Sequence, residues 1–211
     1  MALMKVVPTK TNLLRLKRDL VFAQEGYELL DQKRQILVAE LLALMDRTIA
    51  TQEQMEKTIA VAFDALRKAL LSGGRQNLTR VAPAVNFKAE AEVHFRKVMG
   101  VSLPQVTVTT DDAAPYFSPG ETSVWTEEAV ARFKDTLLEI GKLAELRISL
   151  IRLSDEVRKT MRRVNALEKI AIPTYIETIK YIQDSLEESE RGMIATLKQV
   201  KQRLQKKQGR S

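Results

Sequence analysis

The chain has 211 residues, of which 45% are hydrophobic, 29% charged and only 5% aromatic, and its formal net charge is +7. It contains no cysteine, which excludes disulfides, thiolate metal sites and cysteine nucleophiles and suits a reducing cytoplasm. No run of about 18 apolar residues occurs, so no membrane insertion is expected, and residues 1–10 lack the apolar core of a signal peptide.

The N-terminal part of the chain follows a heptad pattern that predicts a helix over residues 9–71. Thr11 or Asn12 is the expected N-cap, and residues 72–74 (Ser-Gly-Gly) are the expected stop, because glycine readily adopts the left-handed conformation that ends helices. A period of 3.5 residues keeps one seam against a partner helix and supercoils the pair left-handedly. Residues at alternating spacings of three and four form this seam: Leu13, Leu16, Leu20, Ala23, Tyr27, Leu30, Arg34, Leu37, Leu41 and Leu44.

Residues 72–125 lose the helical period and are expected to form an apex segment. Alternating apolar residues predict a short β-hairpin over about residues 91–109, with a tight turn at Met99 and Gly100. The turn-forming residues that follow, from Asp111 to Gly120, are expected to form a loop, and Thr126 is the expected cap of the next helix. A β-hairpin alone is barely stable, so this one should lie against the helices.

A second heptad pattern predicts a helix over residues 126–207. Pro173 should kink or restart this helix, because proline lacks a backbone donor and clashes with the preceding turn, and the seam slips by one step at the same place. Folding the two helices back on each other at residues 71–126 gives a register in which facing residue numbers add to about 198. This register brings the basic residues around Lys10 beside the acidic residues around Glu190. The seam before the slip consists of Ile140, Leu143, Leu146, Leu150, Leu153, Val157, Thr160, Val164 and Leu167.

The predicted fold is therefore all-α: a long antiparallel left-handed coiled-coil hairpin of N- and C-terminal helices, with a short β-hairpin and an irregular segment at its apex. Arg34 and Asn165 place polar groups where leucine would pack better. Single polar residues in a seam fix its register, and a local loss of stiffness is the alternative interpretation.

The sequence predicts no catalytic, cofactor-binding or metal site. His94, the single histidine, has no second imidazole or thiol to complete a metal site. Residues 72–75 (Ser-Gly-Gly-Arg) lack the G-x-x-x-x-G-K-[ST] frame of a phosphate-binding loop. Carboxylates are spread along the helix faces rather than gathered in a cleft. The chain by itself is therefore not expected to be an enzyme.

Several strings of the sequence resemble the D subunit of V-type and archaeal-type rotary ATPases. The most specific is Arg-Arg-Val-Asn-Ala-Leu-Glu over residues 162–168, since leucine heptads alone occur in many proteins. The other matching strings are Pro8-Thr9-Lys10, Ile172-Pro173, Thr178-Ile179-Lys180-Tyr181-Ile182, Leu186-Glu187-Glu188 and Val98-Met99-Gly100-Val101. They follow the order of the family and cover most of the chain.

The resemblance implies a non-catalytic central rotor-stalk subunit. Such a subunit transmits rotation between the membrane ion-driven rotor and the catalytic hexamer, during ATP synthesis or hydrolysis coupled to ion transport. The implied partners are the A and B catalytic subunits, the F subunit and the socket subunit, which is also called the C or d subunit, with one copy of the chain in the complex. The implied location is cytoplasmic and peripheral to the membrane, with no cofactor and no nucleic acid.

Two sets of residues are expected to contact these partners, because exposed apolar stripes often mark interaction sites. At the end that bears both termini, the set expected to contact the catalytic hexamer is Lys10, Arg15, Lys17, Met193, Leu197, Lys198, Val200, Lys201, Arg203 and Leu204. At the apex end, the set expected to contact the F subunit and the socket subunit is Ile59, Phe63, Val93, Phe95, Val106, Phe133 and Leu137.

Two other classes of protein remain open on the sequence alone. A free-standing coiled-coil scaffold accounts for the heptads, but not for the inserted β-hairpin or the family strings. A nucleic-acid binder accounts for the basic termini. However, basic and acidic residues alternate elsewhere in the chain, and aromatic residues suited to base stacking are lacking near those termini.

Overall fold

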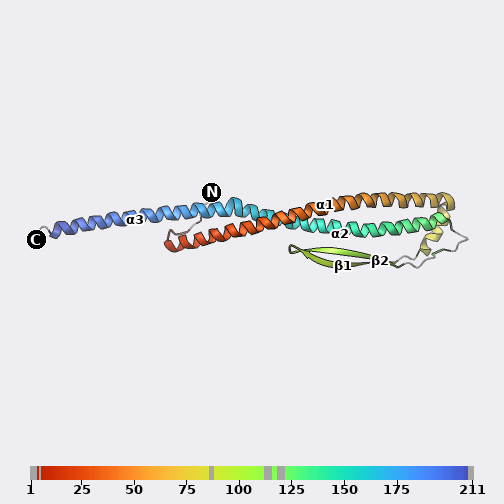
Figure 1. Ribbon diagram of the computed structural model, residues 1–211, viewed down its shortest axis with the longest axis horizontal. Coiled ribbons are helices and arrows are strands. Elements are labelled where there is room, and N and C mark those ends of the chain that lie inside the picture. Colours follow the sequence, from red (N-terminus) through yellow and green to blue (C-terminus); the bar gives the residue numbers. More distant parts are fainter. Residues whose placement is uncertain (1–3, 5, 86–87, 112–115, 118–121, 209–211) are drawn as a thin grey trace. The chain divides into compact units, whose positions relative to one another are not determined.

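The computed structural model describes Met4 and residues 6–85, 88–111, 116–117 and 122–208, without the side chains of Asp111 and residues 204–208. Its elements are α1 (Lys10–Val81), the 3-10 turn η1 (Ala82–Ala84), β1 (Lys88–Val98), β2 (Val101–Asp111), α2 (Val124–Ala166), the π-helical turn η2 (Leu167–Ala171) and α3 (Ile172–Gln208) (Figure 1). The predicted class, two long helical segments with one inserted β-hairpin, is confirmed. The chain divides into two compact units, residues 1–34 with 159–211 and residues 35–158.

The first unit contains the beginning of α1, the end of α2, η2 and α3. Its core consists of Leu16 from α1 and of Ile179 and Ile182 from α3. The N-cap of α1 is Thr9, whose Oγ1 accepts a hydrogen bond of 3.2 Å from the backbone N–H of Asn12, so the cap expected at residue 11 or 12 was wrong.

A polar contact in each unit fixes the register of the paired helices. In the first unit, Lys10 Nζ lies 2.8 Å from Glu190 Oε1, and these residue numbers add to 200. In the second unit, Arg147 Nη2 donates to Gln52 Oε1 at 3.1 Å, and these numbers add to 199. The register of about 198, predicted from folding the chain back at residues 71–126, is therefore confirmed within both units.

The irregularity predicted around Pro173 is the π-helical turn η2. The backbone N–H of Ile172 donates to Leu167 O, five residues earlier instead of four. The turn thus holds one extra residue, and it lies directly before a proline that cannot donate to the preceding turn. The extra residue shifts the heptad phase by one position, which accounts for the slip of the seam. The seam stays buried on both sides of the turn, at Val164 before it and at Ile182 after it.

The two polar residues expected in the seam lie in different environments. Arg34 is half-buried, and its Nη2 lies 2.6 Å from Asp31 Oδ1 on the same helix. Asn165 is exposed, so its expected place in the seam was wrong. The buried residue at this level is the neighbouring Val164, which keeps the heptad spacing from Thr160.

The second unit packs α1, α2 and the β-hairpin around one core. Leu37 of α1 and Leu153 of α2 are 0% exposed, and Leu103 of β2 is buried with them. Fully burying one such side chain contributes about 1.5–3 kcal/mol to folding. The β-hairpin therefore lies against the helices, as predicted.

Helix α1 is interrupted, not ended, at the predicted stop. Gly74 takes φ 74° and ψ 155°, a conformation open mainly to glycine, and helical residues then continue to Val81. At the start of α2, Ser123 Oγ accepts a hydrogen bond of 3.3 Å from the N–H of Trp125. The cap is therefore Ser123, and the expected cap at Thr126 was wrong. The loop predicted from Asp111 to Gly120 falls mostly outside the described residues. Asp111 is the last residue of β2, so its expected place in the loop was wrong.

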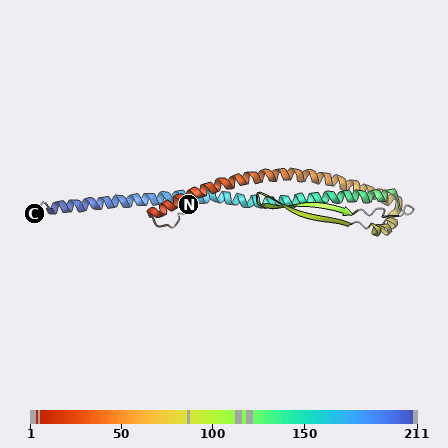
Figure 2. The same cartoon turned by 60° about the horizontal axis from the view of Figure 1, so that its bottom comes forward.

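The β-hairpin has an unbroken antiparallel register from Lys88 opposite Asp111 to Val98 opposite Val101. Met99 and Gly100 form the predicted two-residue turn, with φ of 50° and 85°. Both strands lie alongside α2 in the two ribbon views (Figures 1 and 2), so the β-hairpin runs back along the helices from the apex segment.

None of the helices in the described part of the chain combines the length and the apolar character needed to cross a bilayer.

Candidate interaction surfaces

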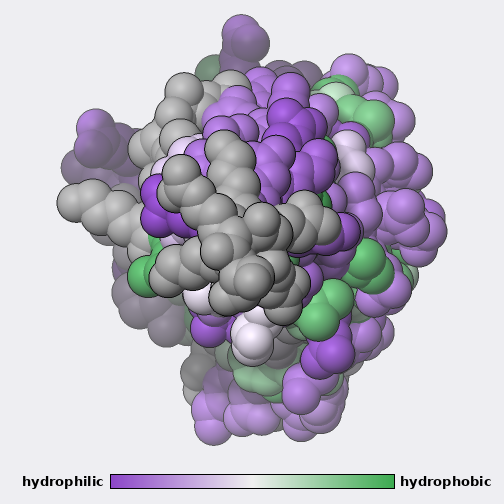
Figure 3. Space-filling model, turned by 90° about the vertical axis from the view of Figure 1, so that its left-hand side faces the viewer, coloured by the Kyte–Doolittle hydropathy of each residue, from purple (hydrophilic) through white to green (hydrophobic). Residues whose placement is uncertain are grey.

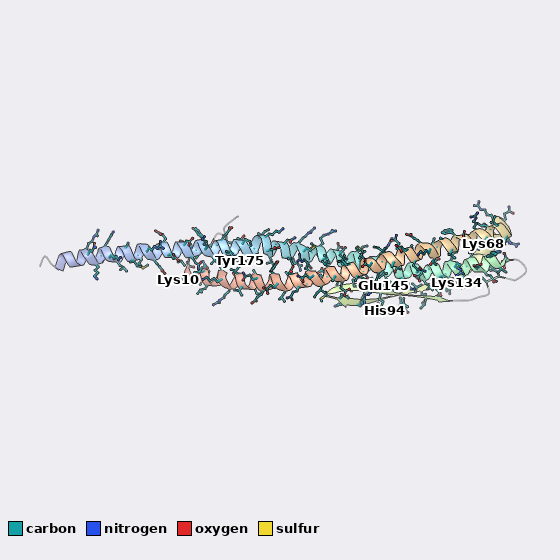
Figure 4. All side chains as sticks on the ribbon, turned by 45° about the horizontal axis from the view of Figure 1, so that its top comes forward. Lys10, Lys68, His94, Lys134, Glu145 and Tyr175 are labelled. Atoms are coloured by element: carbon teal, nitrogen blue, oxygen red, sulfur yellow. The ribbon has the colours of Figure 1, made fainter. Side chains whose placement is uncertain are left out.

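Polar side chains of α2 hold the outer edge of β2. The backbone N–H of Val106 donates to Glu145 Oε2 at 2.8 Å, and Arg152 Nη1 donates to Ser102 O at 2.9 Å. Glu145 is labelled in Figure 4. The guanidinium carbon of Arg152 also lies 5.5 Å from the centre of the Phe95 ring. These contacts give the β-hairpin a fixed position on α2, and no pattern in the sequence indicated them.

A glycine of α2 makes room for the same strand. A Cβ placed on Gly141 would collide with Cγ2 of Val108, so only glycine lets β2 approach α2 this closely. The sequence did carry a signal, since glycine is a poor helix former and here lies inside a heptad pattern.

The end of α3 presents a single helix surrounded by solvent. Residues 187–203 are exposed on every side, and α3 continues beyond the beginning of α1 within the first unit (Figure 1). Met193 and Leu197 remain 63% and 62% exposed, and Val200 is also exposed. The predicted basic residues Lys198, Lys201 and Arg203 are exposed beside them, while the side chain of Leu204 lies outside the described part. This end therefore carries an apolar stripe and positive charge with no covering partner among the described residues.

The three residues of α1 predicted to contact the catalytic hexamer, Lys10, Arg15 and Lys17, are all exposed. They differ in their ion pairing. Lys10 is paired with Glu190, and this hydrogen bond and the attraction between the charges raise the pKa of Lys10 and lower the pKa of Glu190. Arg15 and Lys17 are exposed on the same helix. Seen from the end at which α3 terminates, the surface is largely hydrophilic with separate apolar side chains (Figure 3).

An exposed apolar group on α1 was missed. Phe22 is 78% exposed, and Leu14 and Val21 beside it are more than half exposed. These residues line a shallow depression together with Lys17, one of the predicted contact residues. The sequence feature that could have indicated this group is Phe22, an aromatic residue outside the heptad seam.

The residues expected to contact the F subunit and the socket subunit fall into two groups. Phe63 and Phe133 join α1 to α2, with ring centroids 5.6 Å apart in an edge-to-face contact. Ile59 and Leu137 are half-buried on the same pair of helices. The second group, Val93, Phe95 and Val106, shares one face of the β-hairpin, and Phe95 lies at the level of Arg152. About fifteen helical residues, roughly 22 Å, separate Leu137 from Arg152, and about eight, roughly 12 Å, separate it from Glu145, to which Val106 is bonded. The β-hairpin group therefore lies farther along α2 than the helical group.

A largely apolar cavity of about 360 Å³ lies beside the first group. Phe133 and Leu137 line it, with Leu66 of α1, Leu78 after the break at Gly74, and Ala82 of η1. The cavity was not predicted from the sequence, because no helix was expected after residue 74.

No group of three or more potential metal ligands occurs in the described part of the chain. His94 is exposed on β1, and its Nε2 lies 3.7 Å from Glu92 Oε2 (Figure 4).

These features define a class of protein: a paired-helix protein whose exposed surfaces suit contacts with other chains.

The model of the family described as the D subunit of ATP synthase matches residues 12–202. The chain is 36% identical over 208 residues to the A-type ATP synthase D subunit of Thermococcus sibiricus, covering 97% of each chain. It is 36% identical over 202 residues to the V-type ATP synthase D subunit of Thermotoga neapolitana, covering 95% of this chain and 99% of the relative. It is 38% identical over 202 residues to the A-type ATP synthase D subunit of Pyrococcus furiosus, covering 94% of each chain. The chain belongs to the family of ATP synthase D subunits.

Proposed function

We propose that the chain is the central rotor-stalk subunit of a V-type or archaeal-type rotary ATP synthase. In this role it contributes no catalytic residue and transmits rotation between the membrane rotor and the A and B subunits. The observation that carries the proposal is the family match, which spans both helical segments and the β-hairpin. A stalk acts by contacting alternative states of its neighbours unequally. The first test is native size in cell extracts. Migration within a complex many times the 23.9 kDa of the chain is expected, and migration as a free chain would favour a scaffold.

The proposed contact with the catalytic hexamer is the end of α3 together with the beginning of α1. Its support is the exposed stripe of Met193, Leu197 and Val200, since apolar side chains of this size are usually covered in an assembled protein. The adjacent positive charge would attract acidic loops of the hexamer, but exposed charge contacts are individually weak and screened by salt. The apolar stripe should therefore carry most of the binding.

Two matched triple variants separate these contributions. In one, Met193, Leu197 and Val200 are changed to glutamine; in the other, Lys198, Lys201 and Arg203 are changed to glutamine. Glutamine is a good helix former, so neither variant should unfold α3. The apolar variant should assemble poorly with the A and B subunits and slow ATP turnover, while the charge variant should do so less. Normal assembly and turnover in the apolar variant would show that this end is not the hexamer contact.

The proposed contacts with the F subunit and the socket subunit are the helical group around Phe133 and the β-hairpin group around Phe95. Two charged variants distinguish them: Leu137→Asp in the helical group, and Val93→Asp with Phe95→Asp in the β-hairpin group. The partner lost from co-purification with each variant assigns that partner to that group. Circular dichroism of the free chain controls for unfolding, which matters most for the half-buried Leu137. Retention of both partners by both variants would place the contacts elsewhere.

A further inference from the structure

One edge of the β-hairpin is open over its full length. β1 is exposed except for the half-buried Val98, and within the described residues the sheet contains no third strand. The outer edge of β2, in contrast, is occupied by Glu145 and Arg152 of α2. Any strand added to this sheet must therefore pair with β1.

The backbone groups of β1 that face this open side can be identified. The N–H of Val106 points to Glu145 and away from β1, so Val106 and its opposite residue Val93 form a non-hydrogen-bonded pair. The N–H and C=O of Val93 consequently point to the open side, as do those of every second residue: Ala89, Ala91, Phe95 and Lys97. The register has no bulge and β1 has no proline, two devices that commonly protect an edge strand.

The side chains of β1 have a charge pattern that complements itself. In an antiparallel pair of two β1 strands centred on Val93, all eleven residues of each strand overlap. Glu90 then lies opposite Arg96 of the second copy, and the twofold symmetry makes this pair of opposite charges twice. Glu92 lies opposite the imidazole of His94 of the second copy. On the other face, Ala91 lies opposite the larger Phe95.

Neighbouring registers match less well. An antiparallel pair centred on Glu92 places Glu92 opposite its own copy and Lys88 opposite Arg96, and a pair centred on Ala91 places Glu90 opposite Glu92. A pair centred on His94 places Glu92 opposite Arg96, but it aligns only residues 90–98 and leaves Glu90 opposite Val98. A pair centred on Phe95 aligns only residues 92–98 and leaves Glu90 with no strand residue opposite it. A parallel in-register pair places every charge opposite its own copy. Like charges directly opposite each other destabilise a sheet, whereas opposite charges stabilise it. The pair centred on Val93 therefore combines full overlap, outward-facing backbone groups at its centre, and charge complementarity.

We propose that the free chain dimerises by antiparallel pairing of β1 with β1 of a second copy, centred on Val93. Two β-hairpins then form one four-stranded antiparallel sheet with twofold symmetry. The five outward-facing residues of each strand exchange about ten backbone hydrogen bonds with the second copy. The proposal concerns the chain before it joins other subunits, so it does not depend on the proposed rotor-stalk function.

Charge reversal tests the register in the full-length chain. Sedimentation velocity from about 1 to 100 µM should show a monomer–dimer equilibrium. Glu90→Arg and Arg96→Glu should each weaken the dimer at least about tenfold, because each variant places like charges opposite each other twice. An equimolar mixture of the two variants should dimerise again, since every Arg then faces a Glu. Gln105→Arg, on the same face but on β2, is the matched control and should leave the dissociation constant unchanged.

A backbone variant tests the edge itself. Ala91→Pro removes an N–H that points to the open side and leaves the bonds between β1 and β2 in place, so it should abolish the dimer with all charges intact. Amide exchange of β2 verifies that the β-hairpin stays folded in this variant. A chain that is monomeric at every concentration overturns the proposal. So does a dimer that both charge reversals leave unchanged, or a mixture of the two variants that fails to restore dimerisation.

Discussion

Replacing Gly141 by alanine should loosen the β-hairpin while strengthening the helix beneath it. The new Cβ would collide with Cγ2 of Val108, and the branched valine side chain has little rotamer freedom with which to move away. Overpacking of this kind costs about 1–3 kcal/mol. Alanine in place of glycine within a helix contributes about 1 kcal/mol in the opposite direction. The free energy of global unfolding should therefore fall by no more than about 2 kcal/mol, while the whole cost of overpacking acts on the contact between β2 and α2.

Hydrogen exchange at the amide of Val106 measures this local effect, because that N–H is bonded to Glu145 of α2. A cost of about 1–3 kcal/mol corresponds to an increase of about 5- to 150-fold in local opening. Adding Val108→Ala to Gly141→Ala should restore much of the protection, since it removes the colliding methyl groups. Gly26→Ala is the matched control, because no atom lies within 4 Å of its added Cβ and only the helical gain is expected. Unchanged protection of Val106 in Gly141→Ala would refute the claim that this glycine seats the strand.

Three further outcomes are expected. Leu153→Ala should reduce the free energy of unfolding by about 2–5 kcal/mol in denaturant titrations, because the side chain is fully buried, whereas truncating an exposed leucine should change it little. A double-mutant cycle of Phe63→Ala and Phe133→Ala should give a coupling of about 0.5–1.5 kcal/mol from the edge-to-face rings, and additive effects would contradict a direct contact. Glu190→Gln should return the raised pKa of Lys10 toward its ordinary value in NMR titrations. The stabilisation by this pair should disappear as pH falls through the lowered pKa of Glu190, and as pH rises through the raised pKa of Lys10.

The heptads predicted which residues of each helix face the partner, and the fold-back at residues 71–126 predicted which partner residues they meet. The contact between Lys10 and Glu190 follows from that register alone. Helix caps were harder to predict, since several polar residues at each terminus could accept the same backbone N–H. The N-caps Thr9 and Ser123 were therefore missed, and the nearby polar residues Thr11 or Asn12 and Thr126 were predicted in their place.

Contacts between a helix and a strand could not be predicted from the heptad repeat, because that repeat describes only how helices pack on each other. The position of β2 on α2 depends on the hydrogen bond from Val106 to Glu145. The residues around Glu145 in the sequence do not show whether its carboxylate faces solvent or a strand. The cavity beside Phe133 arises because helical residues continue after Gly74, and one glycine in the sequence does not distinguish a break from an end. The seven residues predicted to contact the F subunit and the socket subunit fall into two groups because the strands run back along α2, and no local pattern specifies how far they run.

The extra residue in the π-helical turn η2 has a consequence for how this chain tolerates changes in length. One residue turns an α-helix by about 100°, so removing one residue from Leu167–Ala171 would rotate the phase of the whole of α3 against the helix before it. Ile182 would leave the interface with α1, and a neighbouring polar residue would replace it. The extra residue lies next to Pro173, which blocks regular helical bonding on its N-terminal side. The turn therefore acts as a phase adjustment between two heptad tracts, and only insertions or deletions that preserve the phase of both tracts should be compatible with this pairing.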